Sequence, residues 1–299
     1  MFKKKQFKIR SFEFILAEIN IEKIKKFTSE NDFMNLSVEL FKELAIVTTI
    51  ISDINCVNKR GIPKGFNRNE AILNGLIIRI NKLQSGILDQ TCQKRLEICY
   101  ILLRCLYESL INLKYLLQGG DDLFDEFVEY SLRKEKELYN KINKNIGKRG
   151  TEIPIEKRMK KSIENTFNVS SMKFEDVNEK NRQSWGDTIF KRAEDVGMDW
   201  LHLSLFGLPS HSVHGNWQDL INYHLSYKNK KFIPNRNWNM PRPQYLLAIG
   251  IISIEILKSY LNHTMKACVE KENIERIIDD IGTRMKIVDS LHEKFLQEI

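Results

Sequence analysis

The segment 96–117 carries apolar side chains on more than one helical face, and it constrains the fold more than any other part of the chain. One stripe, with alternating spacings of three and four residues, consists of Leu96, Cys99, Leu103, Leu106, Leu110, Leu113 and Leu117. A second stripe with similar spacing consists of Ile101, Arg104, Glu108, Ile111 and Tyr115. Such spacings place residues on one face of an α-helix. A helix that is apolar over most of its circumference needs neighbours on most sides, so this segment predicts the central helix of a bundle.

Other parts of the chain show single apolar stripes with the same spacing. They predict helices within residues 40–54, 73–87 and 274–295, the last with a break at Gly282. A long apolar helix is expected from about 244 to 268. No stretch alternates convincingly with period two, so no sheet is expected. The predicted fold class is therefore all-α, a helical bundle.

Composition and breakers predict three regions: an N-terminal helical region at 1–66, a core bundle at 67–225, and C-terminal helices at 226–299 that pack on the core. Within the core, 141–184 has a different character. Its basic residues are Lys141, Lys144, Lys148, Arg149, Lys157, Arg158, Lys160 and Lys161. Only Glu152 and Glu156 oppose them up to position 161. This charge predicts a solvated, partly mobile insertion with a short helix near 156–166.

Charge and motif content exclude several classes of protein. The net charge of +8 is compatible with affinity for nucleic acid. Five cysteines without a C-x-x-C pair predict neither a disulfide framework nor a zinc site. No nucleotide-binding glycine motif occurs, so no cofactor is expected. The longest apolar run, 245–254, is about half of what a bilayer needs, which predicts a cytoplasmic protein without a membrane span.

Two charged residues, Arg104 and Glu108, lie in the second stripe of the central helix. Their spacing of four allows an ion pair, but Arg ahead of Glu is the weaker order for helix stability. The functional interpretation is a polar site in which Arg104 binds an anion such as phosphate and Glu108 orients it. The structural interpretation is a buried ion pair that fixes helix register.

A second polar cluster occupies the segment Leu203 to Asp219. Gly207 and Gly215 flank its central part. It contains Ser210, His211, His214 and Asn216. A His that titrates near neutral pH is the usual general acid or base. The alternatives are histidines satisfied by helix-terminal carbonyls, or a metal site built from both histidines and Asp219, whose spacing matches no strong zinc signature.

A basic loop offers a third set of candidates, Lys59, Arg60 and Lys64, which could contact phosphates through side chains and backbone amides. A plain basic connector accounts for the same residues, and we favour that interpretation. The loop separates the first two predicted helices.

The sequences ILLRCLYESLIN (101–112) and LPSHSVHG (208–215) resemble an uncharacterised bacterial helical family of unknown function. Its signatures are R-x-x-x-E on a helix and a later S-x-x-x-H, filled here by Arg104, Glu108, Ser210 and His214. That family resembles, more distantly, the HEPN superfamily of helical bundles, which implies an up-and-down core.

Many HEPN proteins are metal-independent ribonucleases of toxin and antiviral defence systems that act as dimers. Their motif has an Arg and a later His with four to six residues between them. This sequence departs from that motif, because no Arg lies five to seven positions before any His. Lys258 before His263 has the spacing but is a different cation. The resemblance nevertheless implies RNA as a partner, a second copy of the chain, and a protein partner encoded nearby.

Together these features lead to the hypothesis of a metal-independent ribonuclease or ribonuclease-like effector. His214, assisted by His211, would act as general acid or base, while Arg104 would stabilise the transition state and Glu108 would hold Arg104. Ser210 and Asn216 would contact substrate. The alternatives are a non-catalytic adaptor and a nucleotide sensor. The ribonuclease hypothesis requires Arg104, Glu108 and His214 to line one cavity, although about a hundred residues separate them.

Limited proteolysis should cut first within residues 141–184, because their charge leaves few apolar anchors. Mapping the first fragments by mass spectrometry tests this. Initial cleavage within 93–117 would contradict the predicted organisation.

Overall fold

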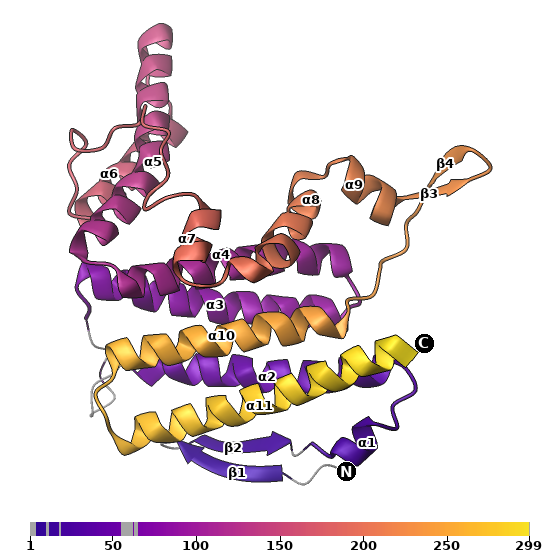
Figure 1. The fold of residues 1–299 in the computed structure, drawn as a ribbon. Coiled ribbons are helices and arrows are strands. Elements are labelled where there is room, and N and C mark those ends of the chain that lie inside the picture. The colour runs from indigo at the N-terminus through magenta and orange to yellow at the C-terminus, as the bar shows by residue number, and fades with distance from the viewer. Residues whose placement is uncertain (1–3, 10–11, 18, 55–61, 63–64, 299) are drawn as a thin grey trace.

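A computed structural model describes residues 4–9, 12–17, 19–54, 62 and 65–298. Helix accounts for 75% of the protein, in agreement with the predicted all-α class. The core is a bundle of five long helices that run side by side (Figure 1). They are α2 (Glu30–Ile54), α3 (Arg68–Cys92), α4 (Leu96–Gln118), α10 (Pro243–Thr264) and α11 (Val269–Glu298). All four predicted stripes lie on these helices, and most of their members belong to the main hydrophobic core.

Helix α4 ends at Gln118, directly before Gly119 and Gly120. Helix α5 (Asp121–Arg149) follows with Asp121 and Asp122 in its first turn, where carboxylates oppose the positive helix end. The predicted break at Gly282 is wrong, because α11 continues through it. A Cβ at Gly282 would lie 3.4 Å from Ile254 Cδ1, so the glycine serves the close approach of α10 to α11.

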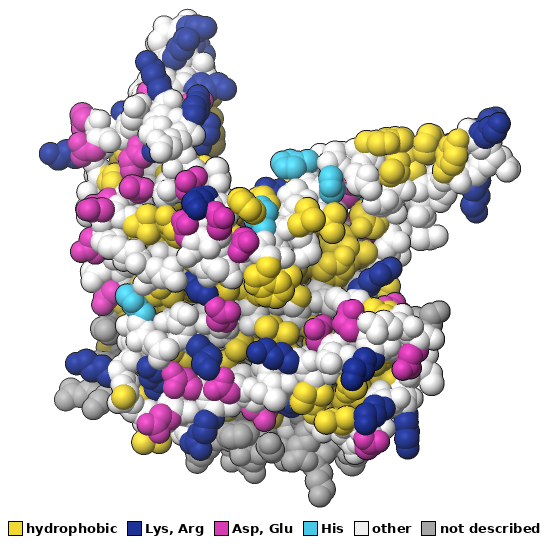
Figure 2. Space-filling view, viewed as in Figure 1, with side chains coloured by type: hydrophobic (Ala, Val, Ile, Leu, Met, Phe, Trp, Pro, Cys, Tyr) yellow, Lys and Arg dark blue, Asp and Glu magenta, His cyan; other side chains and the backbone are white. Residues whose placement is uncertain are grey.

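Within the segment 141–184 the short helix predicted near 156–166 is confirmed, and it forms part of a helical hairpin that the sequence does not predict. Helix α5 extends to Arg149, and α6 (Pro154–Val169) packs beside it as a hairpin that projects from the bundle (Figure 1). The hairpin has its own hydrophobic core, made by Val128, Leu132, Ile142, Ile163, Phe167 and Val177. Its basic side chains gather at the projecting end (Figure 2). The apolar stripe was missed because charged residues dominate both helices; the mobility of the segment stays a prediction.

The expectation of no sheet is wrong for two hairpins. Strand β1 (Lys4–Ile9) pairs with β2 (Phe12–Ala17), and β3 (Leu225–Lys228) pairs with β4 (Lys231–Pro234), both antiparallel. At four to six residues each, these strands are too short for a period-two pattern to stand out. The turn between β3 and β4 holds Asn229 and Lys230 at positive φ, as a two-residue hairpin turn requires. In the described part of the chain, no sheet exceeds two strands.

Helix α10 is long and apolar enough to cross a membrane by length and composition. Most of it is buried, because it packs against α2, α4 and α11 inside the bundle. Its apolar composition is therefore that of a core helix.

A buried ion pair joins α11 to α2. Arg284 Nη2 donates to Glu43 Oε2 at 2.6 Å, and Arg284 Nε donates to Asp280 Oδ2 at 2.8 Å. Both Arg284 and Glu43 are buried. Such a pair adds little stability relative to apolar residues, but breaking it strands a charge in the core.

Replacing Glu43 by Leu should lower the free energy of unfolding by about 3 kcal/mol, because the buried guanidinium loses a carboxylate partner. Urea unfolding followed by circular dichroism measures this. The double variant Glu43→Leu, Arg284→Met should regain most of the loss, since the buried guanidinium is then gone and Asp280, which also loses Arg284, is partly exposed. A double variant as unstable as the single one would show that the pair itself stabilises the fold.

Candidate functional site

The face of α4 that points away from the bundle is covered by the chain from 185 to 214. This covering segment contains α7 (Ile189–Asp195), the 3₁₀ turn η1 (Asp199–Leu201), the π-helical turn η2 (Leu203–Gly207) and α8 (Leu208–His214). Buried Tyr107 of α4 donates a hydrogen bond from its hydroxyl to the Met198 carbonyl at 2.8 Å. The second stripe of α4, predicted from sequence, is therefore the surface on which this segment docks.

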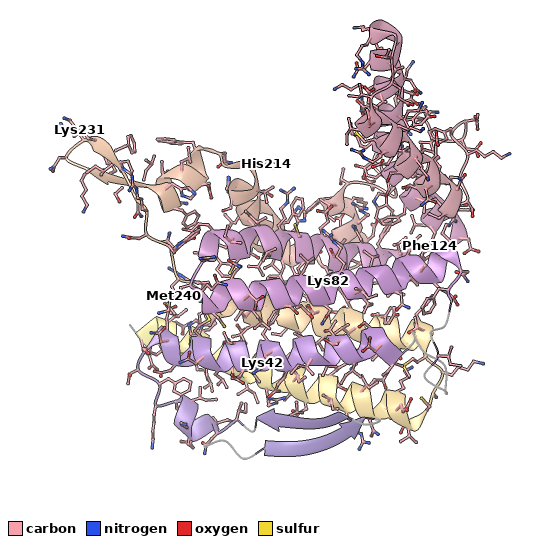
Figure 3. All side chains as sticks on the ribbon, turned by 180° about the vertical axis from the view of Figure 1, so that it is seen from behind. Lys42, Lys82, Phe124, His214, Lys231 and Met240 are labelled. Atoms are coloured by element: carbon pink, nitrogen blue, oxygen red, sulfur yellow. The ribbon has the colours of Figure 1, made fainter. Side chains whose placement is uncertain are left out.

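Arg104 and His214 meet where α8 crosses α4. Arg104 Nη1 lies 3.5 Å from His214 Nε2, although 110 positions separate the two residues. Figure 3 shows His214 over α4, near the solvent-exposed end of α8. The predicted approach of these two residues is confirmed by this distance. Because a guanidinium has only donors, the contact is made with the lone pair of His214 Nε2.

The guanidinium of Arg104 also lies over the Phe206 ring, 4.5 Å from its centroid. Phe206 belongs to η2, and α8 continues directly from that turn. A cation on an aromatic face is attracted by the ring quadrupole. Phe206 therefore fixes the guanidinium beneath His214.

Local sequence explains why His214 stands at this position. Pro209 is in the first turn of α8, where its missing N–H costs no hydrogen bond. Gly215 follows His214 with a φ of 55°, and its N–H donates to the His211 carbonyl. A left-handed residue closes a helix, and glycine adopts that conformation without steric cost. His214 is thus the last residue of a short helix that is held at both ends.

The predicted Arg104–Glu108 ion pair is wrong: no oxygen of Glu108 lies within 4.0 Å of Arg104. The reason is that His214 and Phe206 draw the guanidinium toward α8. The Glu108 carboxylate instead acts on Arg192 of α7, where it opposes the lowering of the Arg192 pKa by burial.

Arg192 is the charged residue that the sequence did not reveal. It is only 4% exposed, and its guanidinium lies 4.0 Å from the Trp185 ring centroid. Its Nε and Nη1 atoms are buried without a hydrogen-bond partner. Only the docking of α7 on α4 brings Arg192 near Glu108, and no local pattern around position 192 signals this.

The other polar residues of the second cluster bond mainly to one another. Asn216 Nδ2 lies 2.7 Å from His211 Nδ1, and Asn216 Oδ1 accepts from the Asp219 amide at 3.3 Å. The Ser210 hydroxyl donates to the Phe206 carbonyl at 2.5 Å. Asn216 therefore orients the His211 ring, while Ser210 ties α8 to η2.

The ligands of the alternative metal site do not converge. Asp219 accepts from the Ser212 hydroxyl at 2.7 Å and pairs with His224 Nε2 at 3.2 Å. In the part of the chain that the structure describes, no three His, Cys, Asp or Glu residues are grouped as metal ligands. Lys59, Arg60 and Lys64 lie outside the described residues.

His202 occupies an aromatic pocket inside the covering segment. Its ring stacks on Phe206 at 4.7 Å and meets the edges of Phe190 and Tyr107 at 5.1 and 6.0 Å. Its Nδ1 atom is buried without a partner, and burial lowers the pKa of the imidazole. His202 is thus neutral and supports Phe206, which in turn supports Arg104.

Comparison with known proteins gives one family match. The model of a family described as a family of unknown function (DUF5677) matches residues 70–232, which run from the first turn of α3 into β4 and include both Arg104 and His214. No curated protein and no solved structure matches the chain.

The lowered pKa of His202 makes stability depend on pH. Below pH 6.5, the ordinary pKa of His, the unfolded chain binds a proton at His202 that the native state excludes. The free energy of unfolding therefore decreases as the pH is lowered. His202→Phe keeps the ring packing and removes the titration. This variant should lose less stability than the wild type between about pH 7.5 and about pH 5.5, as measured by urea unfolding. His263→Phe, at an exposed position, is the control and should behave as the wild type.

Proposed function

This chain belongs to DUF5677, a family of unknown function, and for it we propose a metal-independent ribonuclease activity centred on Arg104 and His214. The observation that carries the proposal is the contact of a cation with a titratable imidazole at 3.5 Å. These groups are the ones that cleavage of RNA by its own 2′-hydroxyl requires. A HEPN-like core, a cytoplasmic location and a role in bacterial defence or toxicity are parts of the same proposal.

In the proposed reaction, His214 Nε2 takes the proton from the 2′-hydroxyl. Before substrate binds, this lone pair faces the Arg104 guanidinium at 3.5 Å. When the phosphate takes over the guanidinium N–H groups, the lone pair becomes available to the neighbouring 2′-hydroxyl. The 2′-oxygen then forms a bond to phosphorus while the bond from phosphorus to the 5′-oxygen breaks. Arg104 stabilises the additional negative charge on the phosphoryl oxygens. The products are a 2′,3′-cyclic phosphate and a 5′-hydroxyl.

His211 is proposed to protonate the leaving 5′-oxygen. In this step the His211 ring is the imidazolium, and it gives up the proton on Nε2. Asn216 lies 2.7 Å from His211 Nδ1 and orients the ring so that Nε2 points away from Asn216. Both histidines lie on α8, so the base and the acid move as one body. Glu108 has no part in this scheme beyond its interaction with Arg192.

A non-catalytic adaptor is the second candidate. It is favoured by Trp200 and Leu203, which expose large apolar side chains to solvent in the covering segment. Exposed apolar residues of this kind often contact another protein. In that case the Arg104–His214 contact would only join α8 to α4.

Incubation of the purified protein with RNA in the presence of EDTA should yield fragments with 2′,3′-cyclic phosphate ends, because no metal takes part in the scheme. His214→Ala and Arg104→Ala should each slow cleavage by about a hundredfold or more, since each removes a group that acts in the transition state. RNA methylated at the 2′-oxygens should resist cleavage. Quantitative gel electrophoresis of labelled RNA provides the rates.

The matched control is His263→Ala, which removes an exposed histidine at the end of α10. It should cleave at the wild-type rate. Equal cleavage by the wild type and His214→Ala, at equal thermal stability, would remove His214 from catalysis. A wild-type protein that cleaves no RNA would instead favour the adaptor.

A further inference from the structure

The β3–β4 hairpin and the irregular segment that returns from it form an arm that projects from the bundle (Figure 1). We define this arm as residues 225–242. It contains no acidic residue, and its basic residues are Lys228, Lys230, Lys231, Arg236 and Arg242, all exposed. The arm is therefore a concentrated positive element at one side of the α8 site.

Exposed aromatic rings accompany these charges. Trp217 is 56% exposed, Tyr227 63%, Phe232 52% and Trp238 54%. Phe232 contacts Trp217 at 5.3 Å and Tyr227 at 4.8 Å between ring centroids, so three of the rings form one row (Figure 2). Leaving four large rings in solvent gives up burial energy, which calls for an interaction with something else.

The chemistry of the arm fits a polynucleotide better than a protein. The core of a protein interface is depleted of charge, with its polar residues at the rim. Here each exposed ring of the arm has a cation within two positions: Lys228 beside Tyr227, Lys231 beside Phe232, and Arg236 near Trp238. Alternation of flat rings with cations matches bases that alternate with phosphates. Rings can stack only on unpaired bases, which selects single strands.

The base of the arm is held firmly to the bundle. Tyr223, just before the arm, contacts Tyr100 of α4 at 6.0 Å, and the hydroxyls of Tyr100 and Tyr245 lie 2.5 Å apart. The Leu96 amide donates to the Asn239 carbonyl at 2.9 Å, so the returning segment meets the start of α4. A bound strand would therefore keep a fixed direction relative to α4.

The arm also leads toward Arg104 and His214. Trp217 opens the short helix α9 (Trp217–Asp219), two positions after the Gly215 that closes α8. The contact of Trp217 with Phe232 joins the row of rings to α9. Figure 1 shows α9 between α8 and the β3–β4 hairpin. A strand on the arm would thus extend along α8.

From this placement we infer that the arm binds single-stranded nucleic acid by stacking bases on Trp217, Tyr227, Phe232 and Trp238, while its Lys and Arg side chains contact phosphates. It delivers a single-stranded RNA substrate to His214, and this second statement rests on the proposed function. Binding itself requires no cleavage, so the two parts can be measured separately.

The test uses the full chain and a fluorescent single-stranded RNA of about 15 nucleotides, with fluorescence anisotropy as the readout. The wild type should bind it, and bind the corresponding RNA duplex at least about tenfold more weakly. Binding of single-stranded DNA with the same sequence shows whether the RNA 2′-hydroxyl contributes to the affinity. Failure of the folded wild type to bind either single strand would overturn the inference and leave the arm to a protein partner.

Two variants of the arm separate its contributions. Tyr227→Ala with Trp238→Ala should weaken binding by about tenfold or more, because two stacking surfaces are lost. The second variant changes three basic residues of the arm to Gln: Lys228, Lys231 and Arg236. It should weaken binding and make the slope of log affinity against log salt concentration less steep by about 2. Circular dichroism confirms that both variants keep the wild-type helix content.

The α5–α6 hairpin supplies matched controls. Lys144, Lys148 and Lys157 are exposed, and changing all three to Gln removes the same charge. Tyr130→Ala removes an exposed ring of α5. Neither control should weaken binding more than about twofold. Weakening equal to that of the arm variants would show attraction by net charge alone and would overturn the inference.

The same RNA is also used to measure cleavage. Binding through the arm without cleavage would support nucleic-acid binding by the arm and overturn the ribonuclease proposal. If both arm variants cleave RNA at the wild-type rate, at RNA concentrations well below saturation, the ribonuclease proposal is supported and delivery of RNA by the arm is overturned.

Discussion

Burial of α4 on two opposite sides is the constraint on which the structure depends. One side packs against α3 and α10, while the other carries Arg104 and Glu108 and must still be covered. Both side chains are half-buried, and a charge that loses water without gaining polar neighbours costs free energy. The covering segment meets that requirement unevenly: it brings His214 to Arg104 and Arg192 to Glu108. The polar groups of the site are therefore a consequence of how α4 is covered.

The sequence predicts those features that depend on one element at a time. The four apolar stripes identify α2, α3, α4 and α11, because the spacing of three and four is a property of a single helix. The approach of His214 to Arg104 was also predictable. A guanidinium on an apolar helix needs hydrogen-bond acceptors, and the segment around Ser210 is rich in uncharged polar groups.

The sequence misses what depends on competition between partners. A spacing of four permits the Arg104–Glu108 pair, yet the Phe206 ring and His214 hold the guanidinium elsewhere. The sequence predicts the short helix near 156–166 but not its packing beside α5, because charge obscures the narrow apolar stripe of the hairpin. The arm left a signal that could have been found, namely eighteen residues, 225–242, with aromatic and basic side chains and no acid.

The docking of the covering segment has a thermal consequence. Arg104 belongs to the bundle, whereas His214 is held by short turns, a few ring contacts and the Tyr107 hydrogen bond. Segments with few buried contacts open at lower free energy than the core around them. On heating, α8 can therefore lift from α4 while the five long helices remain folded. The Arg104–His214 contact would then melt at a lower temperature than the helix content, so the midpoint of the far-ultraviolet signal would overestimate the working range of the site.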